Sequence, residues 1–175
     1  MFMLLRVLGV IAIMTGAVGL GFYYSARDGF RISELREAKK AFTILAAEIE
    51  YMSSPLSTAC QHIAQRTSHT IGQLFSHFSQ LIENNTQGTC DLMWAQSLDY
   101  VREKSFMSVE DFSVLEGFGK TLGYLDKAMQ KNAISYTVDY INQKVTHLES
   151  HVPKNKKMYR SLGIIGGLAL ATILW

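Results

Sequence analysis

Apolar residues recur every three or four positions along most of this chain, which is the spacing of residues on one face of a helix. The clearest stretch runs through Leu35, Ala38, Phe42, Leu45, Ile49 and Met52. No stretch alternates apolar and polar residues in the way that a half-buried strand does. The pattern therefore predicts an all-α protein, whose middle part is a bundle of several short helices.

Pro55 marks the first boundary within this bundle, in the stretch "MSSPLS". Ser54 can cap a helix, and Pro55 suits the first helical position, where a backbone N–H is not needed. Apolar faces with helical spacing follow over residues 56–64 and 71–81. The polar stretch "ENNTQGT" then predicts a loop, because its residues favour turns over helix.

The second half of the bundle begins with a short predicted helix over residues 94–101. Ser108 opens the next helix, since "SVED" resembles a capping box with Asp111 at the third helical position. The apolar face of that helix consists of Phe112, Leu115, Phe118 and Leu122. The last and longest helix carries a near-heptad stripe, typical of packing against another helix, formed by Ile134, Val138, Ile141, Val145, Leu148 and Val152.

The N-terminal segment predicts a membrane span over residues 4–26. Between Arg6 and Arg27 lie 20 uncharged residues, mostly apolar, which is long enough to cross a bilayer. Two tyrosines close the segment, where aromatic rings favour the membrane interface. The alternative is a cleaved signal peptide, but "YYSAR" lacks a small-residue cleavage site, so an uncleaved anchor is favoured.

The C-terminal segment, residues 158–175, predicts a second and shorter span. From Leu162 onward its apolar run covers about 21 Å as helix, against a hydrocarbon core of roughly 30 Å. Starting at Met158, with the Arg160 side chain extended to the headgroups, it covers about 27 Å. Its glycines predict close packing on the first span or on another membrane subunit.

The basic residues assign one orientation to both predicted spans. The first span is followed by Arg27, Arg31, Arg36, Lys39 and Lys40, and only Arg6 precedes it. The second is preceded by Lys154, Lys156, Lys157 and Arg160. Because lysine and arginine concentrate on the cytoplasmic side, residues 27–157 are predicted to be a cytoplasmic domain. Arg27, Lys157 and Arg160 then lie at the membrane interface.

Candidate chemistry is sparse. "GFGKTLG" ends like a phosphate-binding loop, but the position that requires the first glycine of that motif is Val114. His147 and His151 have a spacing that could hold a metal, yet no third ligand completes a motif. A net charge of +2 gives no reason to expect nucleic acid. We therefore predict no catalytic, cofactor or metal site, and a protein that is not an enzyme.

Three stretches together resemble the stage III sporulation protein AB family of endospore-forming bacteria. They are "EIEYMSSPLSTACQHIAQR", which contains Glu48 and Pro55; "GKTLGYLDKAMQK"; and "KMYRSLGIIGGLALATILW". The resemblance covers the chain from end to end. It departs from the family at Pro153, which predicts a kink before the second span.

The resemblance implies a fold like that of the cytoplasmic domain of the inner-membrane platform protein of type II secretion machines. It also implies a location in the mother-cell membrane facing the forespore, within the channel complex that links the two cells. The implied partners are a secretion-type ATPase, stage III sporulation protein AA, and other membrane subunits; a homo-oligomer is compatible with it. The alternative is a membrane-anchored helical sensor or scaffold unrelated to sporulation.

Within "GKTLGYLDKAMQK" the residues suggest separate roles. Gly119 is expected to permit close approach of a second helix, Gly123 to end its helix, and Asp126 to cap the next one. Lys120 lies off the apolar face, so it is expected to be exposed and is a candidate for docking a partner, with a simply solvated lysine as the alternative. Gln130 is a second candidate for docking.

Overall fold

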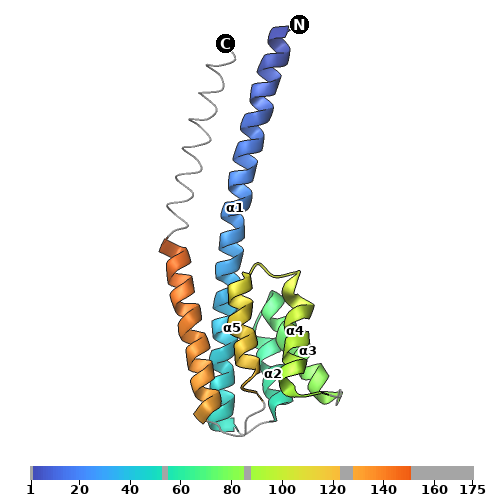
Figure 1. Ribbon diagram of the computed structural model, residues 1–175, viewed down its shortest axis with the longest axis vertical. Coiled ribbons are helices and arrows are strands. Elements are labelled where there is room, and N and C mark those ends of the chain that lie inside the picture. The colour runs from blue at the N-terminus through green and yellow to red at the C-terminus, as the bar shows by residue number, and fades with distance from the viewer. Residues whose placement is uncertain (1, 53–54, 85–87, 123–127, 151–175) are drawn as a thin grey trace. The chain divides into compact units, whose positions relative to one another are not determined.

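A computed structural model describes residues 2–52, 55–84, 88–122 and 128–150, and all regular structure within those ranges is helical (Figure 1). The all-α prediction is therefore confirmed. The chain forms two compact units, which are described separately. Unit 1 comprises residues 1–30 and 147–175, and unit 2 comprises residues 31–146.

The helices follow the predicted order. They are α1 (Phe2–Ala47), the π-helix η1 (Glu48–Met52), α2 (Leu56–Arg66), α3 (His69–Glu83), α4 (Cys90–Arg102), α5 (Val109–Gly119) and a last helix over residues 128–150. Within unit 2, α2 packs on α3, α3 on α4, and α4 on α5.

Two predicted boundaries at the start of the bundle need correction. The first α-helix ends at Ala47 and continues as the π-helix η1, so Ile49 is only half-buried and Glu48 is buried in its place. Pro55 precedes α2 as its N-cap residue and is not its first helical residue. The Pro55 carbonyl accepts the first helical hydrogen bond, from Ala59 N at 3.1 Å, while its own ψ of 143° is extended.

The end of α5 also differs from the prediction. The helix stops at Gly119 and does not reach Leu122. Thr121 N and Leu122 N donate to carbonyls three residues earlier, which makes a tight turn, and Leu122 remains buried within it. The predicted helix end at Gly123 and the predicted cap at Asp126 concern residues that lie outside the described residues.

Unit 2 has an aromatic core to which four helices contribute. Phe42 of α1 meets Phe118 of α5 edge to face, with ring centroids 4.8 Å apart. Trp94 of α4 contacts Phe75 and Phe78 of α3 at centroid distances of 5.4 and 5.1 Å. Edge-to-face pairs are favourable beyond the area that they bury. This cluster fixes α1, α3, α4 and α5 around one centre.

The last helix buries a narrower stripe than predicted. Ile134 and Ile141 are buried as expected, but Thr137 is buried between them and Val138 is half-buried. The Thr137 hydroxyl donates to the carbonyl of Ala133 at 2.9 Å, so its polar group is satisfied inside the helix. Thr137 therefore occupies the buried position that the sequence pattern predicted for Val138.

The predicted spans stay predictions. Residues 4–26 are helical as part of α1, and residues 158–175 lie outside the described residues. Among the residues that the structure describes, no helix combines the length and the apolar character needed to cross a membrane.

Candidate functional site: a polar cluster at the start of α5

The start of α5 carries a network of polar side chains that joins three helices of unit 2. We call it the α5 cluster and define it by Arg31 of α1, Ser108, Glu110 and Asp111 at the start of α5, and Tyr140 and Lys144 of the last helix. It involves the two helices through which the chain enters and leaves unit 2.

Local sequence sets the geometry of Ser108 and Asp111. Ser108 Oγ accepts a hydrogen bond from Asp111 N at 3.3 Å, and Asp111 Oδ2 accepts one from Ser108 N at 2.8 Å. This is the predicted capping box, which is confirmed. The two residues satisfy backbone donors that the helix cannot satisfy itself, and Asp111 is held with its carboxylate buried.

Arg31 binds this capped helix start from α1. Its Nε donates to Asp111 Oδ2 at 2.8 Å, and its Nη2 donates to Asp111 Oδ1 at 3.1 Å and to Ser108 Oγ at 2.8 Å. The Arg31 side chain is 18% exposed and the Asp111 side chain 1% exposed. Such two-pronged, charge-assisted contacts fix orientation as well as distance.

The last helix, which follows α5 in the chain, contacts the same site. Tyr140 donates its hydroxyl proton to Asp111 Oδ1 at 3.1 Å, and Lys144 donates to Glu110 Oε2 at 2.5 Å. Lys144 also lies 5.5 Å from the centre of the Tyr140 ring. The start of α5 therefore binds both the helix that enters unit 2 and the helix that leaves it.

The electrostatics of the cluster follow from this geometry. Burial would raise the pKa of Asp111, but the hydrogen bonds and charge of Arg31 and the hydrogen bonds of Ser108 lower that pKa below its ordinary value. Burial and the negative charge of Asp111 raise the pKa of Tyr140. Asp111 is thus an anion and Tyr140 a neutral donor at neutral pH, which is the arrangement that the network requires.

A second buried carboxylate, Glu34 of α1, fixes the connection between α4 and α5. Its Oε2 accepts hydrogen bonds from Ser105 Oγ and from Phe106 N, both at 2.7 Å. Its Oε1 accepts one from Thr70 Oγ1 of α3 at 2.6 Å. One carboxylate on α1 thus holds a loop and a neighbouring helix in place.

The residues predicted from the sequence occupy several separate places. Lys120 is exposed directly after α5, as expected, and Gln130 is half-buried near the start of the last helix. Arg27 is exposed on α1. Lys157 and Arg160 lie outside the described residues. The assignment of Lys120 and Gln130 to partner docking stays a prediction.

Gly119 makes the close helix approach that its position predicted. A Cβ atom at Gly119 would lie 2.3 Å from Cδ1 of Trp94, which is far inside van der Waals contact. The Trp94 indole N–H donates to the carbonyl of Leu115 at 2.7 Å, so the ring is fixed in this position. Only glycine fits where α5 crosses the indole.

Glu48 belongs to η1 and is buried, with its Oε1 at 3.1 Å from His62 Nδ1 of α2. Its second carboxylate oxygen, Oε2, is also buried and has no hydrogen-bond partner. A π-helical turn is rare and commonly marks a site under structural constraint. Here Glu48 is the first residue of that turn and faces His62 of α2.

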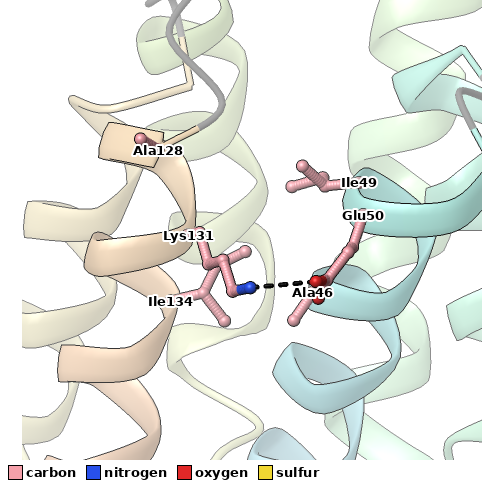
Figure 2. A pocket seen from close by; sticks show the side chains of 6 residues that line it. All are labelled: Ala46, Ile49, Glu50, Ala128, Lys131 and Ile134. Carbon is pink, nitrogen blue, oxygen red and sulfur yellow. Dashed lines mark hydrogen bonds and ion pairs between the residues drawn. The ribbon is translucent and has the colours of Figure 1, made fainter.

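A small apolar pocket lies beside η1, between α1 and the last helix (Figure 2). Its volume is about 190 Å³, and the ion pair between Lys131 Nζ and Glu50 Oε1, 3.0 Å long, crosses it. The other lining residues are Ala46, Ile49, Ala128 and Ile134. Of the described residues that line this pocket, the two ionisable ones, Glu50 and Lys131, are paired with each other.

The chemistry available to the α5 cluster is structural. Among the described residues, no group of three or more histidine, cysteine, aspartate or glutamate side chains is placed to hold a metal ion. Each residue of the α5 cluster is bonded to at least one other member, so the cluster fixes the helices relative to one another. Its function is to hold α1, α5 and the last helix in one arrangement.

The sequence pattern indicated parts of this site but did not connect them. It predicted Arg31 only as a basic residue on the cytoplasmic side of the first span, and Asp111 only as part of a helix cap. Glu34 was not singled out, although Glu34 and Glu48 share the helical spacing of the buried residues Ala41 and Leu45. An acidic residue on an otherwise apolar face is the signal that could have identified both carboxylates, because buried charges need partners.

Comparisons with known proteins agree with the resemblance over the whole chain. The family model described as stage III sporulation protein AB matches residues 6–175. Stage III sporulation protein AB of Bacillus subtilis (strain 168) is 31% identical over 171 residues, which are 98% of this chain and 99% of that protein. A solved structure of a stage III sporulation protein AB is similar with a TM-score of 0.66 and 29% identity, over 70% of this chain and 96% of the solved one. This chain therefore belongs to the stage III sporulation protein AB family.

Proposed function

We propose that this protein is a membrane-anchored, non-enzymatic platform of the channel complex that links mother cell and forespore. Membership of the sporulation family supports a role in sporulation. The α5 cluster supports the platform role, because it ties together the two helices that lead towards the predicted spans. A domain that receives partners in the cytoplasm and transmits their position to two membrane helices requires such a connection.

The α5 cluster can transmit a movement of α5 to α1 and to the last helix, because its hydrogen bonds are directional. The Arg31–Asp111 pair resists rotation of α1 about its axis, since both donors must face one carboxylate. Tyr140 and Lys144 hold the last helix to the same short segment. Movement of α5 would therefore move α1 and the last helix together. If each of these helices only packed separately on unit 2, their movements would not be coupled in this way.

Topology is the first test of this proposal. Cys60 is buried and therefore a poor reporter, so the test uses Ser113→Cys, an exposed position of α5, together with Cys90→Ser. We expect an impermeant thiol reagent to label Ser113→Cys only after cells are opened. Labelling from outside intact cells would place unit 2 on the wrong side and would refute the proposal.

Docking of the secretion-type ATPase is the second test, with Lys120 as the contact. Lys120→Glu reverses an exposed charge, so we expect thermal stability to change little while ATPase capture by the full-length protein falls in a salt-sensitive way. Lys39→Glu is the matched control, because Lys39 is also an exposed lysine of unit 2. Equal capture by both variants would remove Lys120 from the docking surface.

A further inference from the structure

We propose that unit 2 associates head to tail with a second copy of this chain, through the outer face of α1 on one copy and the outer face of α4 on the next. We call these surfaces the α1 stripe and the α4 stripe. The α1 stripe consists of Arg36, Lys40, Thr43 and Ala47, and the α4 stripe consists of Leu92, Gln96, Asp99 and Glu103. The contact involves unit 2 alone and does not depend on the predicted membrane spans.

Each stripe is a single exposed line along its helix. In both stripes successive members are four, three and four residues apart, which is the spacing of one helix face. All eight residues are exposed, and Leu92 is 56% exposed although it is large and apolar. At 1.5 Å per residue each stripe is about 16 Å long. The two surfaces therefore have the same length and the same spacing.

The two stripes lie on opposite sides of unit 2. Phe42 of α1 and Trp94 of α4 meet edge to face in the core, with ring centroids 6.4 Å apart. At about 100° per residue, Lys40 lies about 160° from Phe42 around α1. Asp99 lies about 140° from Trp94 around α4. Surfaces that complement each other from opposite sides of one molecule favour a head-to-tail contact, in which each copy uses both of them.

The directions of α1 and α4 allow the stripes to align. Glu34, near the start of α1 in unit 2, accepts a hydrogen bond from Phe106 N just after α4. Phe42, later in α1, contacts Trp94 near the start of α4. The two helices therefore run in opposite directions within one copy (Figure 1). A rotation about an axis parallel to both helices keeps α1 of one copy antiparallel to α4 of the next.

In that antiparallel alignment the stripes match position by position. The four facing pairs are Arg36 with Glu103, Lys40 with Asp99, Thr43 with Gln96, and Ala47 with Leu92. Two pairs join opposite charges, one joins a hydroxyl to an amide, and one places a small residue against a large apolar one. A shift of one helical turn in either direction keeps only one of the two charge pairs, and a parallel alignment keeps neither. The match therefore selects one register.

The α1 stripe lies on a basic face. With the flanking residues Lys39 and Glu37, this face carries three basic residues and one acidic residue, a net charge of +2. Lys40 lies 4.0 Å from Glu37, which is a loose surface contact that a new partner can replace. Arg36 also interacts within its own chain, so Lys40 is the main basic residue of the contact.

The α4 stripe lies on an acidic face. Asp91, Asp99 and Glu103 are exposed, and Arg102 is the one basic residue of α4, which gives this helix and its C-cap a net charge of −2. The Asp99 side chain is 72% exposed, although Arg102 Nε lies 3.2 Å from its Oδ1. Asp99 can therefore accept a second cation from outside.

Charges next to the two faces do not change the sign of either. Two pairs add no net charge, Glu50 with Lys131 beside the α1 stripe and Glu116 with Lys120 on α5. If Asp139 of the last helix is counted with the basic face and Lys104 with the acidic face, the net charges are +1 and −1. Opposite charge commits each stripe to the other, and hence to a second copy.

The contact is expected to be weak and selective. Exposed ion pairs contribute little affinity, and a single helix face on each copy covers less than the area of a standard protein interface. Opposite charges instead select the orientation and the register, because other alignments lose attraction or bring like charges together. Association should therefore decrease as the salt concentration rises.

The experiment measures disulfide crosslinking between purified full-length copies that carry one reactive cysteine each. Thr43→Cys and Gln96→Cys, each with Cys90→Ser, place thiols at a facing pair. Cys60 is buried and its thiol stays protonated. A bridge within one copy is impossible, because each copy has a single exposed cysteine. Gln143→Cys is the matched control, since Gln143 is an exposed glutamine outside both stripes.

Under mild oxidation with copper phenanthroline, we expect Thr43→Cys to crosslink with Gln96→Cys several-fold faster than with Gln143→Cys. The preference should disappear at high salt. Equal rates for the two combinations would overturn the contact. Faster crosslinking of Thr43→Cys with itself would also overturn it, because that result would indicate a symmetric contact through α1 alone.

Charge reversal tests the pairing itself. Lys40→Glu in the Thr43→Cys copy should slow crosslinking several-fold, because it places two carboxylates opposite each other, and Asp99→Lys alone in the Gln96→Cys copy should slow it by a similar factor. Mixing the two reversed copies should restore the rate, since the pair is then present with its signs exchanged. A misfolded copy could not be restored by a change in its partner. Lack of rescue would overturn the pairing of Lys40 with Asp99.

Discussion

Arg31 and Asp111 are separated by 80 residues, yet the guanidinium of one donates to both carboxylate oxygens of the other, at 2.8 and 3.1 Å. Asp111 also belongs to the capping box that starts α5. One carboxylate therefore serves local and long-range structure together. The stability of α5 and its attachment to α1 should accordingly depend on the same residue.

Replacing this carboxylate should be costly. Asp111→Ala leaves Arg31 without its partner and removes half of the capping box, so we expect a loss of about 3 kcal/mol in the free energy of unfolding. Tyr140→Phe, which removes only one hydrogen bond to the same oxygen, should cost about 1 kcal/mol. Chemical denaturation of the purified full chain measures both. Equal costs for the two variants would contradict a central role for Asp111.

The same pair predicts a dependence on acid. The pKa of Asp111 is lower in the folded protein than in the unfolded chain, so its contribution to stability is complete above the unfolded value near 3.8. It should be lost as the pH falls from about 4 through the folded pKa. Asp111→Asn should therefore lose less stability than wild type over this range. The measurement is the unfolding midpoint of both proteins across acidic pH. If the Arg31–Asp111 pair contributed nothing, the midpoints of wild type and Asp111→Asn would change with pH in parallel.

Two glycines of α5 should respond oppositely to alanine. Gly119→Ala drives a methyl group into Trp94, and overpacking of this kind costs about 1–3 kcal/mol. Gly117→Ala meets nothing and replaces a poor helix former, so it should stabilise by up to about 1 kcal/mol. Thermal unfolding of the two variants measures both signs. A neutral Gly119→Ala would mean that the indole moves aside easily.

Cys60 should make the protein sensitive to alkaline pH. Burial, assisted by the nearby Cys90, raises the pKa of Cys60 from 9.0 to about 12. The unfolded chain therefore loses this proton from about pH 9, while the folded protein keeps it until about pH 12. Stability should fall across that window, by up to about 4 kcal/mol at its upper end. Cys60→Ala should have a flatter profile than wild type in unfolding measurements between pH 8 and 11, despite a lower stability at neutral pH.

Glu34 should control the order of the α4–α5 connection. Glu34→Leu leaves Phe106 N and two hydroxyl groups without their acceptor, so the Phe106 amide should exchange with solvent much faster. Glu34→Gln keeps an oxygen for Phe106 N, and the Thr70 hydroxyl can rotate to accept from the new amide. Hydrogen exchange at residues 103–107 should therefore change far less in Glu34→Gln. Similar exchange in both variants would exclude the carboxylate as the residue that holds the loop.

The predicted boundaries show where local reasoning succeeds and where it fails. The capping box at Ser108 was predictable because all its bonds lie within four residues. The end of α5 was misjudged because Leu122 continues the apolar spacing of the helix, although it lies in the turn that follows Gly119. The π-helix at Glu48 has no signal in the local pattern.

The sequence by itself determined the helical class, the approximate helix order, the cap at Ser108 and the uneven distribution of basic charge, because each depends on neighbours within a turn or two or on composition. The tertiary structure decided which charges are buried and with whom. The packing of α1, α4 and α5 around Trp94 brings Arg31 to Asp111 and Glu34 to Phe106. Contacts across such separations depend on packing of whole helices, which no local pattern encodes.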